Sequence, residues 1–321
     1  MRPIRSAPPS RQRGDLLTEI ARRFYLGDES QTEIARDLGL DPSTVSRHLK
    51  RAREEGIVHV EIRSPRRQDL DLGRAVANRY RIARVVVAPA AEDLDELFGP
   101  IAAEFVGGLL RSGMRLGVSW GRTVASVVRH LWPGLVGELQ IAQLAGGIND
   151  PVPGIQGNEL VRQVAEKFPG SEVSYLHAPA IVGSEMVRDV LLADRTIQAA
   201  IESAERTELA LVGIGQMEPD ATLHAGGHVG TDDWNRLVAE GAVGNMNTRF
   251  FDAAGEPVGL LEGRTIAIGW HALRAIPTVI AVALGRDRVP AIRGALATHA
   301  VDILITDDVT ARALLRPAQK R

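Results

Sequence analysis

The chain of 321 residues contains no cysteine, and only 4% of its residues are aromatic. Without cysteine it forms no disulfides and no thiolate zinc sites, and its core must rest on aliphatic side chains. No stretch approaches the roughly 20 apolar residues of a membrane-spanning helix. The first 15 residues are basic, but they lack the apolar run of a signal peptide. We therefore expect a soluble, cytoplasmic protein without a membrane partner.

The net charge is only −2, but the charged residues are distributed unevenly. Residues 1–67 carry 14 Lys and Arg against 10 Asp and Glu, a net charge of +4. Residues 68–321 carry 24 basic and 30 acidic residues, a net charge of −6. A basic first part followed by an acidic remainder is expected when only the first part contacts phosphates.

The length of the chain favours about two domains. Residues 1–14 are rich in Arg, Pro and Ser, and we expect them to form a disordered tail. A small helical domain is predicted over residues 15–66. Residues 63–69 lack apolar side chains and are typical of a linker, so the second domain is predicted to cover residues 67–321.

The second domain alternates between two kinds of segment. Continuous apolar runs predict strands over residues 83–88, 115–120, 139–144, 209–214, 265–268, 278–283 and 301–305. Amphipathic segments between them predict helices over residues 97–110, 123–131, 159–168, 195–204, 289–297 and 309–315. Buried Val, Ile and Leu strands separated by helices indicate an α/β fold with a parallel sheet and helices on both faces.

The small domain has the pattern of a helix-turn-helix. Its predicted elements are helices over residues 15–26, 31–38 and 42–55 and a strand or wing over 57–62. Ile34 and Leu38 share one helix face, and Val45 and Leu49 repeat this spacing in the next helix. The pattern places two amphipathic helices next to each other, joined by a short turn.

Small and turn-forming residues join these two helices. Ala35 lets the following helix cross closely, and Gly39 lies where the chain turns sharply and a positive φ costs glycine least. We expect the side chain of Asp41 to cap the third helix, with Pro42 at its first position. The alternative is a plain three-helix domain with a charged surface. The spacing, the basic first part and the polar helix face together favour DNA binding.

The exposed face of the third predicted helix carries polar and basic side chains that suit a DNA major groove. Ser43, Thr44 and Arg47 are expected to contact base edges, because the N-terminal residues of a recognition helix lie deepest in the groove. Basic residues further along that helix are expected to contact phosphates. The predicted DNA-contacting residues are Gln31, Thr32, Ser43, Thr44, Arg47, His48, Lys50 and Arg51. The predicted partner is double-stranded operator DNA.

In the second domain, the pattern of residues 115–131 predicts a strand, a turn of small residues and the start of a helix. Gly117 and Gly121 flank the turn. Free backbone amides and the helix dipole at such a helix start suit an anion. Ser119 and Thr123 can add hydroxyl donors, and Arg122 can add a positive charge. The alternative is that the glycines only allow the chain to turn.

Other predicted strands also end in glycine or polar residues. Gly146 and Gly147 follow one strand, and Asp307 follows the last. Ligands of open parallel sheets bind at the carboxyl ends of the strands. We therefore expect these loops to border one crevice.

The order of these segments resembles the SorC family of regulators, close to the DeoR-type regulators that respond to sugar phosphates. The resemblance covers residues 15–316. Its pieces are the helix-turn-helix, Gly-Val-Ser-Trp-Gly-Arg-Thr at 117–123, Leu-Ala-Gly-Gly at 144–147, Leu-Val-Gly-Ile-Gly at 211–215, Gly-Ala-Val-Gly-Asn-Met-Asn-Thr-Arg-Phe-Phe-Asp at 241–252, and Ile-Thr-Asp-Asp at 305–308. Their order is more specific than any one of them.

The resemblance implies a regulator of a carbohydrate-utilisation operon, acting as activator or repressor. It implies a Rossmann-like effector-binding and oligomerisation domain, similar to sugar-phosphate isomerases, and assembly into a homodimer or homotetramer. The effector it implies is a sugar or sugar phosphate, with its phosphate or equivalent group on the 117–123 loop. The expected effector-binding residues, including Asp307 from the strand ends, are Ser119, Gly121, Arg122, Thr123, Gly146, Gly147, Asn245, Arg288 and Asp307.

Two of these positions depart from the family pattern. Asn245 stands where the family usually has Asp or Glu, and Arg288 stands where Lys is usual. A neutral amide cannot accept hydrogen bonds as a carboxylate does, and Arg offers a planar fork where Lys is a point charge. These departures leave open the oxidation state, charge and stereochemistry of the effector, and whether it is phosphorylated.

The competing interpretation is an active isomerase or deaminase, which needs a placed general acid and base. The candidates are Asp150, Glu159, His177, Asp252 and Asp307. Each also fits a cap, a loop or the surface, and a DNA-binding domain has no use in that chemistry. We therefore expect no enzymatic activity and no cofactor.

His224 and His228 are four residues apart and could share a metal ion if they lay on a helix. Gly226 and Gly227 stand between them, however, and favour a loop. We therefore expect no metal site.

Overall fold

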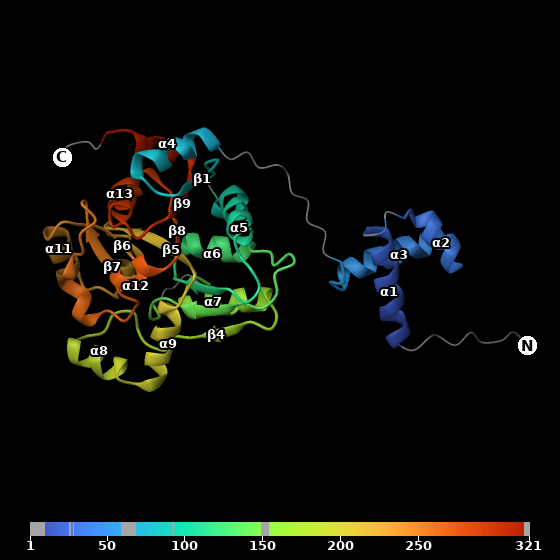
Figure 1. The fold of residues 1–321 in the computed structure, drawn as a ribbon, viewed down its shortest axis with the longest axis horizontal. Coiled ribbons are helices and arrows are strands. Elements are labelled where there is room, and N and C mark those ends of the chain that lie inside the picture. Colours follow the sequence, from blue (N-terminus) through green and yellow to red (C-terminus); the bar gives the residue numbers. More distant parts are fainter. Residues whose placement is uncertain are drawn as a thin grey trace, which may run out of the picture. The chain divides into compact units, whose positions relative to one another are not determined.

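The computed structural model describes residues 10–25, 27, 29–58, 69–91, 93–148 and 154–317. The chain divides into two compact units, residues 1–66 and 67–321 (Figure 1). The proposed domain boundary, the linker before residue 69 and most of the predicted wing lie outside the described residues. None of the helices in these ranges is both long and apolar enough to span a lipid bilayer.

The first unit contains the three expected helices, α1 (Ser10–Tyr25), α2 (Gln31–Leu38) and α3 (Pro42–Glu54). The second and third agree with the prediction to within one residue. Helix α1 begins at Ser10, five residues before the predicted start of the first helix. Arg and Gln are good helix formers, so the helix extends beyond the first apolar residue that marks its amphipathic pattern. The core of this unit consists of Ile20, Ala21, Ile34, Ala35, Val45, Leu49 and Ala52.

The two ends of α2 are formed by local sequence signals. The Ser30 hydroxyl accepts the amide of Glu33, and the Glu33 carboxylate accepts the amide of Ser30, which forms a capping box. Gly39 ends the helix with φ of 64°, as its position predicted. Asp41 starts α3, but its side chain forms no cap hydrogen bond, contrary to our expectation. The Asp41 carbonyl accepts the Thr44 amide instead, so that amide no longer needs a side-chain partner.

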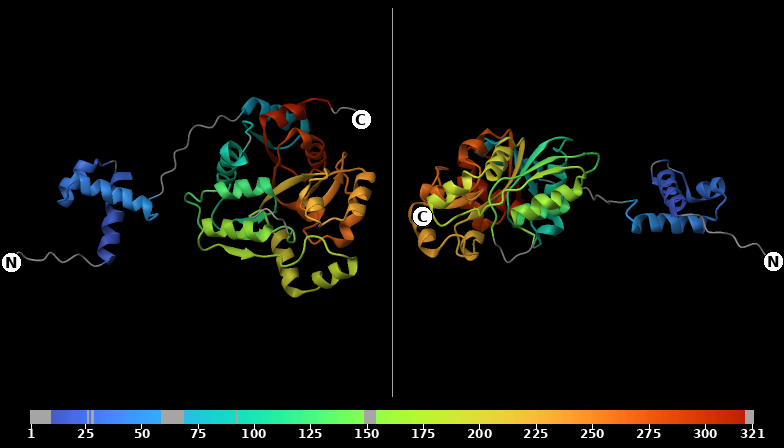
Figure 2. Two further views of the ribbon diagram at one scale, coloured as in Figure 1. Left: turned by 180° about the vertical axis from the view of Figure 1, so that it is seen from behind. Right: turned by 90° about the horizontal axis from the view of Figure 1, so that it is seen from below.

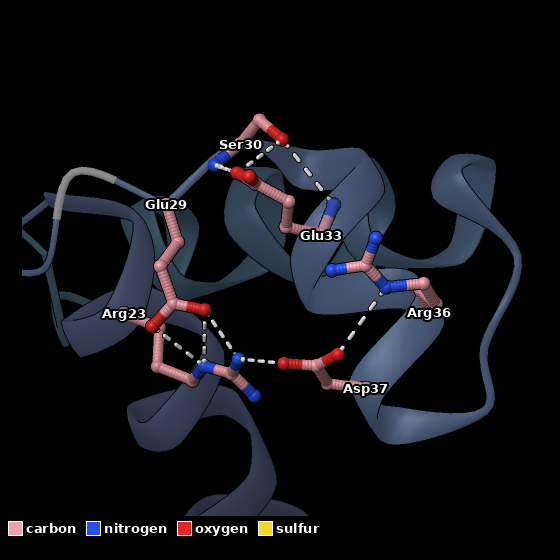
Figure 3. A network of polar contacts seen from close by, with 6 residues as sticks. All are labelled: Arg23, Glu29, Ser30, Glu33, Arg36 and Asp37. Atoms are coloured by element: carbon pink, nitrogen blue, oxygen red, sulfur yellow. Dashed lines mark hydrogen bonds and ion pairs between the residues drawn. The ribbon is translucent and has the colours of Figure 1, made fainter.

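A charged network joins α1 to α2 (Figure 3). The Arg23 guanidinium bonds to the Glu29 carboxylate and reaches Asp37 on α2 at 2.8 Å. Arg36 contacts the same Asp37 carboxylate at 3.5 Å. These hydrogen bonds raise the pKa of Arg23 and lower the pKa of Asp37, so the network stabilises the charged forms of both.

The second unit is built on one large sheet, as predicted. Its parallel strands lie in the order β1 (Arg84–Ala88), β9 (Ile303–Asp307), β8 (Thr278–Val282), β5 (Leu209–Gln216), β2 (Arg115–Val118), β3 (Gln140–Gln143) and β4 (Glu172–Ser174). The antiparallel hairpin of β6 (Ala242–Met246) and β7 (Arg249–Asp252) pairs with the end of β5. The sequence reading had not predicted this hairpin.

Helices cover both faces of the sheet, as Figure 2 shows. Along β1, Val85 and Val87 face one layer, and Val86 and Ala88 face the other. The first layer contains α4 (Leu70–Tyr80), α12 (Trp270–Ala275), α13 (Val289–Ala297) and α14 (Asp308–Leu315). The second contains the turn Leu94–Phe98, α5 (Gly99–Gly107), α6 (Arg122–His130) and α7 (Gly157–Lys167). The predicted three-layer α/β arrangement is therefore confirmed.

The remaining elements follow the sheet strands along the chain. They are α8 (Glu185–Leu192), α9 (Arg195–Glu205), α10 (Thr222–Ala225), α11 (Thr231–Ala239) and two 3-10 turns, η2 (Gly259–Arg264) and η3 (Arg286–Arg288). The predicted strand over 265–268 is wrong, since this segment makes only isolated bridges. The Arg249 guanidinium takes up the carbonyls of Ala267 and Ile268, so these groups are not free to form a regular ladder.

Candidate functional site

A pocket of about 630 Å³, including its open mouth, lies at the carboxyl ends of the neighbouring strands β2 and β5. From β2 the chain continues towards β3, and from β5 it continues towards β8 on the other side. Such a divergence point is where open α/β sheets bind ligands. The lining residues are Ser119, Trp120, Gly121, Arg122, Thr123, Gly213, Ile214, Gly215, Gln216, Ala221, Thr222, Leu223, Asn245, Asn247 and Arg288.

Two guanidinium groups line this pocket, and its lining includes no carboxylate. Burial lowers the pKa of Arg288, and the charge of Arg122 lowers it further, while Asp287 and Asp220 partly oppose the shift. Neither the Arg122 nor the Arg288 guanidinium forms a hydrogen bond or ion pair with another described residue. A pocket with two unpaired cations is electrostatically suited to an anion.

Two buried polar atoms of the lining lack a partner among the described residues. They are the indole nitrogen of Trp120 and the side-chain oxygen of Gln216. The indole N–H can only donate and the amide oxygen can only accept. A buried polar group without a partner is costly, so both atoms are suited to bind polar groups of a ligand.

The loop between β2 and α6 presents a helix N-terminus to the pocket. Gly121 precedes α6 with φ of 132°, a conformation that a residue with a Cβ rarely adopts. Its amide donates to the Ile155 carbonyl. The first amides of α6 have no partner within the helix, and they add positive potential beside Arg122.

The β6–β7 hairpin supplies the opposite wall. Asn245 faces Gly215 in the β5–β6 ladder, and a Cβ on Gly215 would lie 2.5 Å from the Asn245 amide nitrogen. Glycine at 215 therefore allows the Asn245 side chain to lie across β5. Asn247 and Thr248 form the turn of the hairpin with φ of 52° and 62°. Both are buried, and Asn247 also lines the pocket.

The structure brings six of the nine predicted effector-binding residues into this one pocket. These are Ser119, Gly121, Arg122, Thr123, Asn245 and Arg288. Gly146, Gly147 and Asp307 are not among its lining residues. A Cβ on Gly146 would lie 2.5 Å from the Pro179 backbone, so glycine is needed there for close packing. Asp307 caps α14 by accepting the Thr310 amide at 2.6 Å.

The sequence reading missed several lining residues. Trp120 lies inside the 117–123 motif, but we had not selected it. Gln216 follows the Gly-Ile-Gly strand end, and its position just after a predicted strand was the available signal. Asn247 belongs to the 241–252 motif, where two asparagines stand close together. Thr222 lies on the short helix α10, which no pattern in the sequence predicted.

The predicted DNA-contacting residues lie along α2 and α3 with their side chains at least partly exposed. Thr32, Ser43, Arg47, Lys50 and Arg51 are exposed, whereas Gln31, Thr44 and His48 are partly buried. The Arg47 guanidinium donates to the Thr44 hydroxyl at 3.0 Å. This bond holds two of the proposed base-contacting side chains together on the first turns of α3.

Each of the two units matches a family of known proteins. Residues 64–316 match the family described as "Putative sugar-binding domain", and residues 27–59 match a winged helix-turn-helix DNA-binding family. The full-length sorbitol operon regulator SorC from Klebsiella pneumoniae has a similar structure, with a TM-score of 0.74 and 28% identity, covering 97% of this chain and 100% of that one. The chain belongs to the SorC family of transcriptional regulators.

Relatives found by sequence comparison also match over nearly their whole length. The deoxyribonucleoside regulator of Bacillus subtilis is 32% identical over 95% of this chain and 98% of its own. The sorbitol operon regulator of Klebsiella pneumoniae is 29% identical over 94% of this chain and 98% of its own. The relatives are named as regulators, and the recognition of a SorC-family regulator with a DNA-binding first unit is confirmed.

Proposed function

We propose that this regulator binds an anionic sugar, most simply a sugar phosphate, in the pocket between β2 and β5, and that this binding sets its affinity for operator DNA. The operon is expected to serve carbohydrate use, as the names of the relatives indicate for those proteins. The observation that carries the proposal is the pair Arg122 and Arg288, unpaired in a pocket without a carboxylate. A phosphate carries about −1.5 to −2 charges at neutral pH, which matches two guanidinium groups.

The neutral part of the lining supports a polyhydroxyl ligand. Trp120 offers a donor and Gln216 an acceptor, both unsatisfied, and the Asn245 side chain adds a group of each kind. A hydroxyl can donate and accept, so a sugar satisfies such a mixed lining. An apolar anion would leave the Gln216 oxygen without a partner.

We further propose that the pocket is a sensor and not an active site. Its lining residues include no His, Asp, Glu, Lys or Tyr to act as a general acid or base. Of the candidates weighed from the sequence, Asp150 lies outside the described residues. Glu159 bonds to Arg162 and Gln163, Asp252 accepts two amides of its own turn, and Asp307 caps α14. His177 stacks on Tyr175 away from the lining.

A homodimer or homotetramer is the assembly that we propose for DNA binding. Helix-turn-helix regulators bind two half-sites about one helical turn apart, which requires two heads. The effector then acts by favouring one arrangement of the heads, and DNA must change effector affinity by the same factor.

A thermal-shift screen tests the proposed ligand class. Sugars, sugar alcohols and their phosphates would be compared as matched pairs on the wild-type chain and on Arg288→Ala. We expect phosphates, but not their free sugars, to raise the unfolding temperature of the wild type. The variant should lose most of that shift. Free sugars that stabilise both proteins equally would contradict an anionic effector.

A further inference from the structure

The hydroxyl groups of Ser119 and Thr123 are already committed to partners within the protein. Ser119 Oγ donates to the Asn247 side-chain oxygen at 3.1 Å, and its backbone amide donates to the Leu211 carbonyl at 2.9 Å. Thr123 Oγ1 donates to the Val282 carbonyl at 2.9 Å. A hydroxyl has one proton to give, so neither side chain retains a donor.

The orientation of Asn247 fixes the direction of the first of these bonds. Its amide nitrogen donates to the Leu144 carbonyl at 3.1 Å, and a carbonyl can only accept. The Asn247 oxygen therefore points at Ser119, and the hydroxyl must be the donor. The left-handed backbone at Asn247, with φ of 52°, is one that asparagine tolerates better than most residues.

We propose that Asn247 is a positioning residue that makes Ser119 a hydrogen-bond acceptor. Ser119 then accepts a hydrogen bond from a hydroxyl group of the sugar and does not bind its phosphate. A phosphate oxygen needs donors, and Ser119 has none left. A sugar hydroxyl can donate to the free lone pairs of Ser119, which lines the pocket. This inference rests on the proposed function, because it assigns parts of one ligand to parts of that pocket.

The phosphate then binds elsewhere in the pocket, where donors remain. The remaining donors include the two guanidinium groups, the Trp120 indole, the first amides of α6, the Thr222 hydroxyl and the Asn245 side-chain amide. Gln216 then joins Ser119 as a second acceptor for sugar hydroxyls. The pocket thus has a donor part for the anion and an acceptor part that selects for hydroxyls.

Isothermal titration calorimetry with inorganic phosphate, ribose 5-phosphate and glucose 6-phosphate separates the two parts. One of the two sugar phosphates will bind more tightly to the wild type. We expect Ser119→Ala to lower the affinity for that sugar phosphate by about five- to tenfold, as for a lost neutral hydrogen bond. The same variant should lower the affinity for inorganic phosphate by less than about twofold, while Arg288→Ala lowers the affinity for all three ligands. A loss of phosphate affinity in Ser119→Ala as large as that in Arg288→Ala would overturn the inference.

A double-mutant cycle tests the role of Asn247 itself. Asn247→Gly keeps the left-handed backbone accessible but frees the Ser119 proton. In that background Ser119 can donate a hydrogen bond to phosphate. Adding Ser119→Ala should therefore lower the affinity for inorganic phosphate by about threefold or more. A purely structural role of Asn247 would leave the effect of Ser119→Ala on phosphate unchanged, which would contradict the inference. Failure of wild-type protein to bind any of the three ligands would instead contradict the anionic pocket, and this assignment with it.

Discussion

Arg288 shares its pocket with Arg122, and its pKa is lowered first by burial and then by the positive charge of Arg122. An anion bound between the two guanidinium groups would offset their mutual repulsion. A free regulator with this arrangement holds a site that is favourable for a ligand of opposite charge.

Arg288→Ala should therefore lower the affinity for inorganic phosphate and for sugar phosphates by about ten- to a hundredfold, because a charge-assisted hydrogen bond is lost. Calorimetry on the full chain measures this directly. Arg286→Ala is a matched control, because Arg286 lies on the same 3-10 turn but is exposed and is not a lining residue. Equal losses in the two variants would indicate a general effect of surface charge.

The two glycines of the 144–147 motif should respond differently to alanine. A Cβ on Gly146 would lie 2.5 Å from the backbone of Pro179, whereas on Gly147 the nearest atom would be 3.9 Å away. We expect Gly146→Ala to lower the free energy of unfolding by about 1–3 kcal/mol through overpacking. Gly147→Ala should cost much less. Urea unfolding compares the two, and effector affinity lost without any loss of stability would restore Gly146 as a contact residue.

The capping box of α2 should make the first unit sensitive to acid. Hydrogen bonds from the Ser30 hydroxyl and amide lower the pKa of Glu33 below its ordinary value of 4.5. The stabilisation is therefore complete above pH 4.5 and is lost as the pH falls through the lower folded-state pKa. Glu33→Gln should lower the hydrogen-exchange protection factors of the α2 amides at neutral pH and flatten their decrease on acidification. Parallel pH profiles for wild type and variant would contradict this.

Base and phosphate contacts can be distinguished on α3. Arg47→Ala should reduce specific DNA affinity by about 1–3 kcal/mol, measured by fluorescence anisotropy on a duplex selected from a random library. Lys50→Ala should weaken all duplexes to a similar degree and reduce the salt dependence of binding by about one unit of slope. Unchanged discrimination between selected and random duplexes in Arg47→Ala would place the recognition surface elsewhere.

The parts of the fold that the sequence predicted are those with local, periodic signals. Ile34, Leu38, Val45 and Leu49 mark the helix faces by spacing alone, and the strands that are buried on both faces appear as continuous apolar runs. The β6–β7 hairpin was not predicted, because its turn is Asn247-Thr248 and not the Asn-Gly pair that usually marks such a turn. A threonine with positive φ is tolerated only through tertiary packing, which no local pattern records.

The site was predictable to the extent that it follows the strand ends. Ser119 to Thr123 could be placed because a glycine turn between a strand and a helix has a local signature. Gly146 and Asp307 also follow strands, yet close packing and helix capping account for them. The direction of the Ser119 hydrogen bond depends on Asn247, which is 128 residues away in the chain. Such long-range polar partners follow from the fold and from no sequence pattern.

The most direct test of the account measures operator affinity against effector concentration. Fluorescence anisotropy would follow a selected duplex titrated with the sugar phosphate that stabilises the protein best, for the wild type and for Arg288→Ala. We predict that the sugar phosphate changes wild-type DNA affinity by about fivefold or more, and that the variant needs at least about tenfold more ligand for the same change. Equal responses of both proteins, or an equal response to the unphosphorylated sugar, would contradict the central claim that the Arg122–Arg288 pocket senses an anionic sugar.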